Sequence, residues 1–108
     1  MQITISGHQI DITPALREFV LEKLKKLERH SNKIQNIHVY IKVEQSIRQI
    51  AEADVTITKD KLHASAESEN MYTSIDLLIE KLNTQLIKHK EKIIDRRDDP
   101  NDLRDTDY

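Results

Sequence analysis

Two segments of this chain carry lysines and arginines at spacings that suit contact with phosphate groups. The stretch 81–92, KLNTQLIKHKEK, holds four lysines against one glutamate, and the stretch 23–33, KLKKLERHSNK, holds five Lys or Arg against one glutamate. Cationic side chains about one helical turn apart can pair with a phosphate backbone whatever its base sequence. Both segments are therefore candidate sites for an anionic partner.

Catalysis, metal binding and cofactor binding have weak support. The chain has no cysteine and one glycine, which excludes thiolate chemistry and most Gly-rich phosphate loops, and it contains no HExxH motif. His38, His63, Ser65 and Asp54 could share the outer face of a sheet, but an open sheet has no cleft to exclude water. We therefore expect no enzyme activity, no metal site and no cofactor.

The net charge of −2 conceals a division within the chain. Residues 1–94 carry 14 Lys or Arg and 13 Asp or Glu, whereas residues 95–108 carry 3 Arg and 6 Asp. Because electrostatic fields act locally, an acidic total does not argue against an anionic partner. The length and this division predict a single domain at 1–94, followed by an acidic disordered tail at 95–108.

Hydrophobic patterning predicts the order β-α-β-β-β-α. Strands are expected at 2–6, 36–45, 51–58 and 62–68, and helices at 14–30 and 70–94. Thr13 and Asn70 are the expected helix caps, and Pro14 suits a first helical position. Gly7 is expected to mark a turn or bulge, and the segment 59–61 is expected to form a hairpin connection.

The fold class that follows is α+β. Three consecutive strands with one apolar face each predict an antiparallel meander, and two amphipathic helices should cover that face. Inward alanines at Ala51, Ala53, Ala64 and Ala66 suggest that a helix lies close over the strands. No apolar run is long enough for a membrane span and no signal peptide is evident, so a soluble cytoplasmic protein is expected.

A helical wheel places the cations beside the apolar stripes. In the last helix Lys81, Lys88 and Lys92 share one border with Ser74 and Gln85, and Lys90 lies on the other border. In the first helix Lys26 and His30 border the stripe, Lys23 lies nearer its edge and Arg29 lies further out. Lysines at such a border often do no more than cover the core with the apolar part of their side chains. Whether the two borders merge depends on how the helices pair.

Other partners remain open at this level. The outer sheet face or the acidic tail could bind another protein, which would make the chain a protein-interaction module. A basic amphipathic helix can also bind a membrane or a partner protein, but here its stripe is needed to cover the strands. Single-stranded RNA on the sheet is disfavoured because Tyr40 is the only aromatic residue, apart from histidines, expected on that face.

The chain resembles the short ribosome hibernation promoting factors, which are relatives of protein Y. The resemblance covers about residues 1–94, from ITISGHQIDITPALREFVLEKLKKLE to HASAESENMYTSIDLLIEKLNTQLIKHKEK. Its most specific parts are ITPALREFV, HASAE, and M-Y-x-x-I-D-x-L-I-x-K-L. No single part would suffice, but together they are long and specific.

The resemblance implies a fold akin to double-stranded RNA-binding domains and binding to the small ribosomal subunit. The implied site is the mRNA channel, where A- and P-site tRNA would contact 16S rRNA, so that translation is blocked and idle ribosomes are preserved in stationary phase. It implies no reaction, no cofactor and a monomer when free. By position, the implied rRNA contacts are Lys23, Lys26, Arg29, Lys81, Lys88, Lys90 and Lys92.

The resemblance leaves the effect on ribosome pairing open. Long relatives carry a second domain that pairs ribosomes, and none is expected in this chain, so pairing would need ribosome modulation factor as a partner. An acidic tail, in contrast, is a feature of protein Y, which opposes pairing. Details such as HASAE favour the hibernation promoting factors, but the tail at 95–108 does not.

Overall fold

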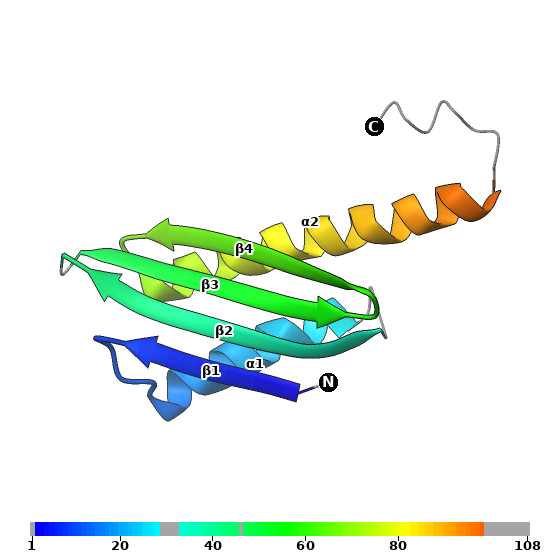
Figure 1. Cartoon of the computed structure of the whole chain (residues 1–108). Helices are drawn as coiled ribbons and strands as arrows, with labels where there is room; N and C mark the ends of the chain where they lie inside the picture. Colours follow the sequence, from blue (N-terminus) through cyan, green and yellow to red (C-terminus); the bar gives the residue numbers. More distant parts are fainter. Residues whose placement is uncertain (1, 29–32, 46, 99–108) are drawn as a thin grey trace.

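The computed structural model describes residues 2–28, 33–45 and 47–98, with the backbone alone described at Glu28 and over 90–98. Its element order confirms the predicted β-α-β-β-β-α pattern (Figure 1). The elements are β1 (Gln2–His8), α1 (Pro14–Glu28), β2 (Ile34–Glu44), β3 (Arg48–Ile57), β4 (Asp60–Ser68) and α2 (Met71–Asp98).

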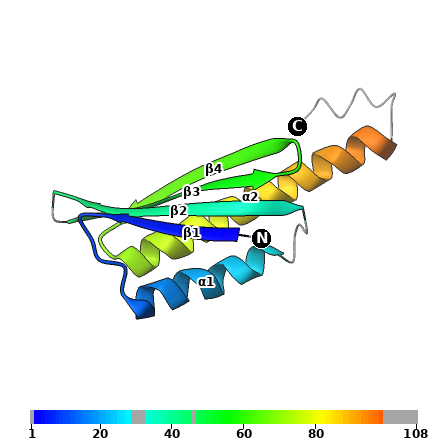
Figure 2. The ribbon, with the colours of Figure 1, turned by 60° about the horizontal axis from the view of Figure 1, so that its bottom comes forward.

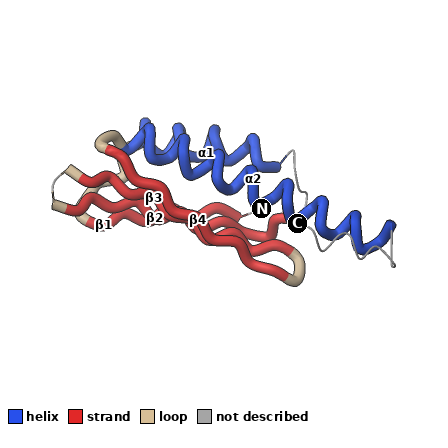
Figure 3. The backbone as a smooth tube through the Cα atoms, turned by 90° about the horizontal axis from the view of Figure 1, so that it is seen from above, coloured by secondary structure: helices blue, strands red, loops and turns tan. Residues whose placement is uncertain are grey.

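The strands form one sheet in the order β1-β2-β3-β4. The pairs β2–β3 and β3–β4 are antiparallel, which confirms the predicted meander, whereas β1 is parallel to β2, with Ile3 opposite Ile37. Parallel neighbours require a long crossover connection, and α1 supplies it. Both helices lie on the same face of the sheet and leave the other face open (Figures 2 and 3).

The core lies between this sheet face and the two helices. Its members are aliphatic residues of both layers, and α2 packs against β3 and β4. The four inward alanines are at most 5% exposed, which confirms the expectation that a helix lies close over these strands. The fully buried apolar side chains of α1 and α2 are Val20, Leu24, Leu27, Ile75, Leu78, Leu82 and Leu86.

Both predicted helix caps are present. The backbone N–H of Leu16 donates to Thr13 Oγ1 over 3.1 Å, and the N–H of Tyr72 donates to Asn70 Oδ1 over 2.8 Å. Each side chain therefore satisfies a backbone donor that has no partner inside its own helix. These caps set where α1 and α2 begin.

Gly7 does not mark a turn, so that expectation was wrong. It lies within β1 opposite Ile41, and a Cβ atom at this position would lie 2.7 Å from the carbonyl oxygen of Ile10. The chain folds back closely over Gly7 after β1 ends. The requirement for glycine here is space, because its φ is not positive.

Most element boundaries differ by a few residues from the expected ones; for example, β1 ends at His8 instead of 6 and β3 begins at Arg48 instead of 51. The β3–β4 connection is Thr58–Lys59 rather than 59–61, and Lys59 adopts a left-handed conformation with φ of 68° where glycine is more usual. α2 continues to Asp98 instead of ending near Ile94. It ends shortly before Pro100, which disfavours helical conformation in the residue before it. The rest of the expected tail, 99–108, lies outside the described residues.

Candidate nucleic-acid interface

The cations of α1 face α2 across a cleft. Lys23 and Lys26 line its α1 side, and Asp76, Glu80 and Asn83 line its α2 side, with Leu27 and Ile79 also lining it. The residues 23 and 26 are three apart and so lie on the same side of α1. The cleft thus brings two predicted cations together, but it also brings two carboxylates opposite them.

Lys23 is held in this cleft by contacts to both helices. Its Nζ lies 3.1 Å from Asp76 Oδ1 and 5.2 Å from the centre of the Phe19 ring. Phe19 in turn packs edge-on against Tyr72 of α2, with ring centroids 4.8 Å apart. These four residues form a clamp between the helices, which we call the interhelical clamp. Its sequence signal is the spacing of four residues on each helix, 19/23 and 72/76.

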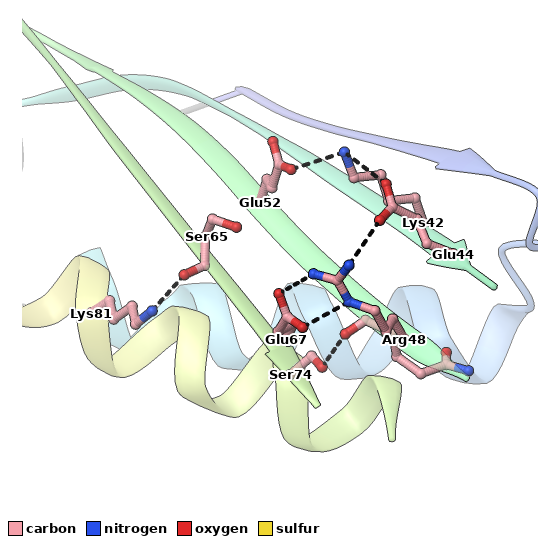
Figure 4. Close-up of polar contacts among 9 residues, drawn as sticks. Lys42, Glu44, Arg48, Glu52, Ser65, Glu67, Ser74 and Lys81 are labelled. Atoms are coloured by element: carbon pink, nitrogen blue, oxygen red, sulfur yellow. Dashed lines mark hydrogen bonds and ion pairs between the residues drawn. The ribbon is translucent and has the colours of Figure 1, made fainter. Parts of the chain in front are cut away.

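The cations of α2 lie on its opposite flank, beside β4. Lys81 Nζ donates to the backbone carbonyl oxygen of Ser65 over 2.6 Å (Figure 4), and Gln85 Nε2 donates to that of His63 over 2.9 Å. Because β4 is an edge strand, its outward carbonyl groups have no neighbouring strand to bond them. Lys81 and Gln85 therefore cap this edge. Lys88 is exposed and lies two helical turns beyond Lys81.

Ser74, placed with these residues on the helical wheel, is buried instead. Its side chain is 0% exposed, and its hydroxyl donates to the carbonyl oxygen of Gln49 over 2.6 Å. Ser68 Oγ lies 2.9 Å from the same hydroxyl. Ser74 therefore connects the start of α2 to β3 and β4 and is not part of a cationic surface.

The two cationic borders do not meet in one cleft. The row of α1 (Lys23 and Lys26) and the row of α2 (Lys81 and Lys88) lie on two sides of α2, and the exposed Leu77 and Thr84 occupy the helix surface between them. A helix with its side chains is about 10–12 Å wide, so the rows are separated by about that distance. The helix layer thus presents two rows of cations on either side of a ridge.

For three of the predicted rRNA-binding residues, the structure describes no side chain. Arg29 lies outside the described residues, and for Lys90 and Lys92 only the helical backbone is described. Among the side chains that are described, Lys26 and Lys88 have neither an ion pair nor a hydrogen bond, and both are exposed. These two ammonium groups are therefore available to an external anion.

The outer face of the sheet carries a network of paired charges (Figure 4). Arg48 makes a two-point contact with Glu67, with Nε–Oε2 and Nη2–Oε1 distances of 2.9 and 2.7 Å. Hydrogen bonding to Arg48 lowers the pKa of Glu67, and hydrogen bonding to Glu67 raises the pKa of Arg48. Lys42 pairs with Glu52 over 3.1 Å. Charges paired in this way make a solvated surface.

Two histidines of this face have close polar partners. His63 Nδ1 lies 2.6 Å from Asp54 Oδ1, and His38 Nε2 lies 2.8 Å from Ser6 Oγ. Over the described ranges, no three His, Asp or Glu side chains gather as a metal site would require.

None of the described helices has the length and apolarity that crossing a membrane requires.

The architecture is that of a small α+β domain whose two helices cover one face of a four-stranded sheet. The family model described as Sigma 54 modulation protein / S30EA ribosomal protein matches residues 3–94, and the chain belongs to this family. This confirms the family resemblance seen in the sequence.

The chain is similar to relatives in this family over most of their length. The chain is 50% identical to the ribosome hibernation promoting factor of Azotobacter vinelandii over 97 residues, which is 90% of each chain. It is 44% identical to that of Escherichia coli (strain K12), covering 86% of this chain and 97% of the relative. A ribosomal subunit interface protein from Coxiella burnetii has a similar structure, with a TM-score of 0.80 at 38% identity, covering 84% of this chain and 99% of that one.

Proposed function

We propose that this protein is a ribosome hibernation factor that binds the small ribosomal subunit and blocks translation. The site would be the mRNA channel, over the positions of A- and P-site tRNA on 16S rRNA. The family and the names of its members support association with the ribosome. The observation that carries the RNA contact is the pair of cationic rows on either side of α2.

The geometry favours folded RNA over single strands. Rows about one helix width apart can contact phosphates on two sides of a groove, and the wide, shallow minor groove of an RNA helix accepts such a surface. The ridge between the rows carries the uncharged Leu77 and Thr84, and also Glu80, which lines the hollows on both flanks of α2. Shape-based recognition of this kind is what a fold akin to double-stranded RNA-binding domains would provide.

Lys26 and Lys88 are the residues with which to test this contact. Both are exposed and unpaired within the described structure, so reversing their charge removes no internal contact. We expect Lys26→Glu/Lys88→Glu to lose at least tenfold in affinity for purified small subunits, measured by co-sedimentation at 100 mM salt. Circular dichroism should show that the variant stays folded.

The matched control reverses two cations that belong to neither row. Lys59 and Lys61 lie at the β3–β4 turn and are exposed, so Lys59→Glu/Lys61→Glu makes the same change in net charge. We expect this control to lose less than threefold in affinity. Equal losses in both variants would mean that only the total charge matters and would refute the assignment of the rows.

The relatives' names state ribosome hibernation, and the effect on ribosome pairing is part of the proposal. We propose that the protein acts by binding, without catalysis or a cofactor, in the cytoplasm, and that it promotes ribosome dimers in stationary phase with ribosome modulation factor as partner. Sucrose gradients of cells with and without the protein test this. Loss of dimers without it supports the proposal, and a gain of dimers would instead indicate a protein Y-like factor that keeps ribosomes single.

A further inference from the structure

The outer face of the sheet contains a hollow that the helix-layer contacts do not use. It spans β1, β2 and β3 and is lined by the side chains of Ser6, His8, Tyr40, Lys42, Glu52 and Asp54, with Gly7 and Ile41 also lining it. The helices cover the opposite face of the sheet (Figure 3). A ligand in this hollow would therefore leave both cationic rows free.

The aromatic wall of the hollow is held in place. The ring of Tyr40 stacks on the ring of His38, with centroids 3.9 Å apart and planes 15° from parallel. His38 is itself fixed by the 2.8 Å contact between its Nε2 and Ser6 Oγ. The Tyr40 ring is therefore already ordered, and a planar group could stack beside it at little further entropic cost.

The charges of the hollow favour a cation. The hollow is lined by one lysine, Lys42, and by two carboxylates, those of Glu52 and Asp54. Lys42 already pairs with Glu52 at 3.1 Å and with Glu44 at 4.0 Å, so an anion would have to displace a carboxylate to reach it. Asp54 uses Oδ1 to contact His63, and its side chain is 52% exposed, which leaves it accessible to a donor.

The two faces of the molecule also differ in overall sign. The described side chains of the outer sheet face carry three cations and four carboxylates, namely Lys42, Arg48, Lys61, Glu44, Glu52, Asp54 and Glu67. Those of the helices carry six cations and four carboxylates, namely Arg17, Lys23, Lys25, Lys26, Lys81, Lys88, Glu18, Glu22, Asp76 and Glu80. An anionic partner is favoured on the helix layer and a cationic one on the sheet.

We propose that this hollow binds an arginine side chain of a basic polypeptide. A guanidinium group is planar, stacks on aromatic rings, and donates hydrogen bonds to carboxylates in a fixed geometry. Tyr40 would supply the ring, and Asp54 and Glu52 would supply the carboxylates. An ammonium group cannot stack in this way, and an unpaired nucleotide would bring its phosphate to a site with more acids than cations.

Arginine selectivity can be measured with two short peptides. The full chain, labelled with ¹⁵N, is titrated with acetyl-Gly-Arg-Gly-Arg-Gly-amide and with the matching lysine peptide. We expect the arginine peptide to shift the amide resonances of Ser6, Tyr40 and Glu52, with at least threefold tighter binding than the lysine peptide. Equal affinities for the two peptides, or shifts centred on the helices, would overturn the proposal.

Variants assign the binding to the ring and the carboxylate. Asp54→Asn and Tyr40→Leu should each weaken arginine-peptide binding at least fivefold, whereas Tyr40→Phe keeps the ring and should bind within twofold of the wild type. Glu22→Gln, on the exposed surface of α1, removes the same charge as Asp54→Asn and should have no effect. Unchanged binding in Asp54→Asn and Tyr40→Leu would contradict the proposal.

Two further measurements distinguish arginine binding in the hollow from nucleotide binding and from binding of the small subunit. If adenosine or uridine monophosphate shifts the same amides and the arginine peptide does not, the hollow binds bases and the proposal is wrong. The inference does not rest on the rRNA contact, because Lys26→Glu/Lys88→Glu should keep peptide binding while losing small subunits. Conversely, failure of peptide binding with intact subunit binding would refute only the arginine site.

Discussion

Lys23 of α1 and Asp76 of α2 form an ion pair, with 3.1 Å between Nζ and Oδ1, inside the cleft that separates the two helices. Lys23, a candidate phosphate-binding residue, is thus already paired with a carboxylate of the same molecule. The pair is partly exposed, with 26% of the lysine and 50% of the aspartate side chain accessible, so a phosphate group could replace the carboxylate. In the proposed interface, Asp76 would therefore compete with RNA phosphate for Lys23.

Replacing Asp76 should strengthen binding to the small subunit. Asp76→Asn removes the competing charge, and partly exposed ion pairs contribute about 0.2–1 kcal/mol, so we expect a gain in affinity of roughly 1.5- to 5-fold in co-sedimentation at low salt. Glu22→Gln is the control, because it removes an equal charge from α1 outside the cleft. Weaker binding by Asp76→Asn would show that the carboxylate positions Lys23 instead.

The cap on the edge of β4 predicts a change in self-association. Lys81→Ala/Gln85→Ala removes both donors to the backbone carbonyl groups of Ser65 and His63 and exposes a strand edge. Such edges pair with other chains, so we expect faster aggregation of the variant on mild heating, followed by light scattering. Thr73→Ala/Thr84→Ala, also on α2, serves as the control. Equal aggregation of both variants would mean that the cap does not protect the edge.

Ser74 is expected to be important for stability. In Ser74→Ala the carbonyl group of Gln49 loses the hydrogen bond from the buried Ser74 hydroxyl, which typically costs about 0.5–1.5 kcal/mol in the free energy of unfolding. Urea denaturation measures this cost. Thr73→Ala, at the exposed neighbouring position, should change the free energy by less than about 0.5 kcal/mol. A similar small change in Ser74→Ala would contradict the assignment.

The pair between Arg48 and Glu67 predicts a dependence of stability on pH. Because the pKa of Glu67 is lowered in the folded protein, its contribution is present above the pKa of the unfolded chain and is lost as pH falls through the folded value. Glu67→Gln should therefore be less stable than the wild type at pH 7, and the difference should be smaller at pH 3. Urea denaturation at both pH values checks this. An equal difference at the two pH values would refute the charge-based explanation.

Local signals in the sequence predicted most of the fold. The alternation in the strands, the caps at Thr13 and Asn70, and the inward alanines each depend on residues close in the chain, and all three predictions were confirmed. Lys59 at the β3–β4 turn gives no such signal, because a lysine rarely adopts a positive φ. That is why the turn was placed incorrectly.

The candidate site was harder to predict from the sequence than the fold. The helical wheel gives Ser74 and Gln85 similar positions beside Lys81, but only Ser74 is close enough to β3 to be buried. Likewise, periodicity shows that Lys23 and Asp76 each border a stripe, but not that they face each other. Which flank of α2 meets α1 and which meets β4 is decided by tertiary packing.

The salt dependence of binding tests the central claim most directly, namely that cations on both flanks of α2 contact rRNA phosphates. The logarithm of the association constant should fall linearly with the logarithm of the salt concentration, with a slope that grows by roughly 0.7–0.9 for each phosphate contacted. Removing one contact from each flank, in Lys26→Gln/Lys88→Gln, should make the slope shallower by roughly 1.5. A slope equal to that of the wild type would contradict the claim.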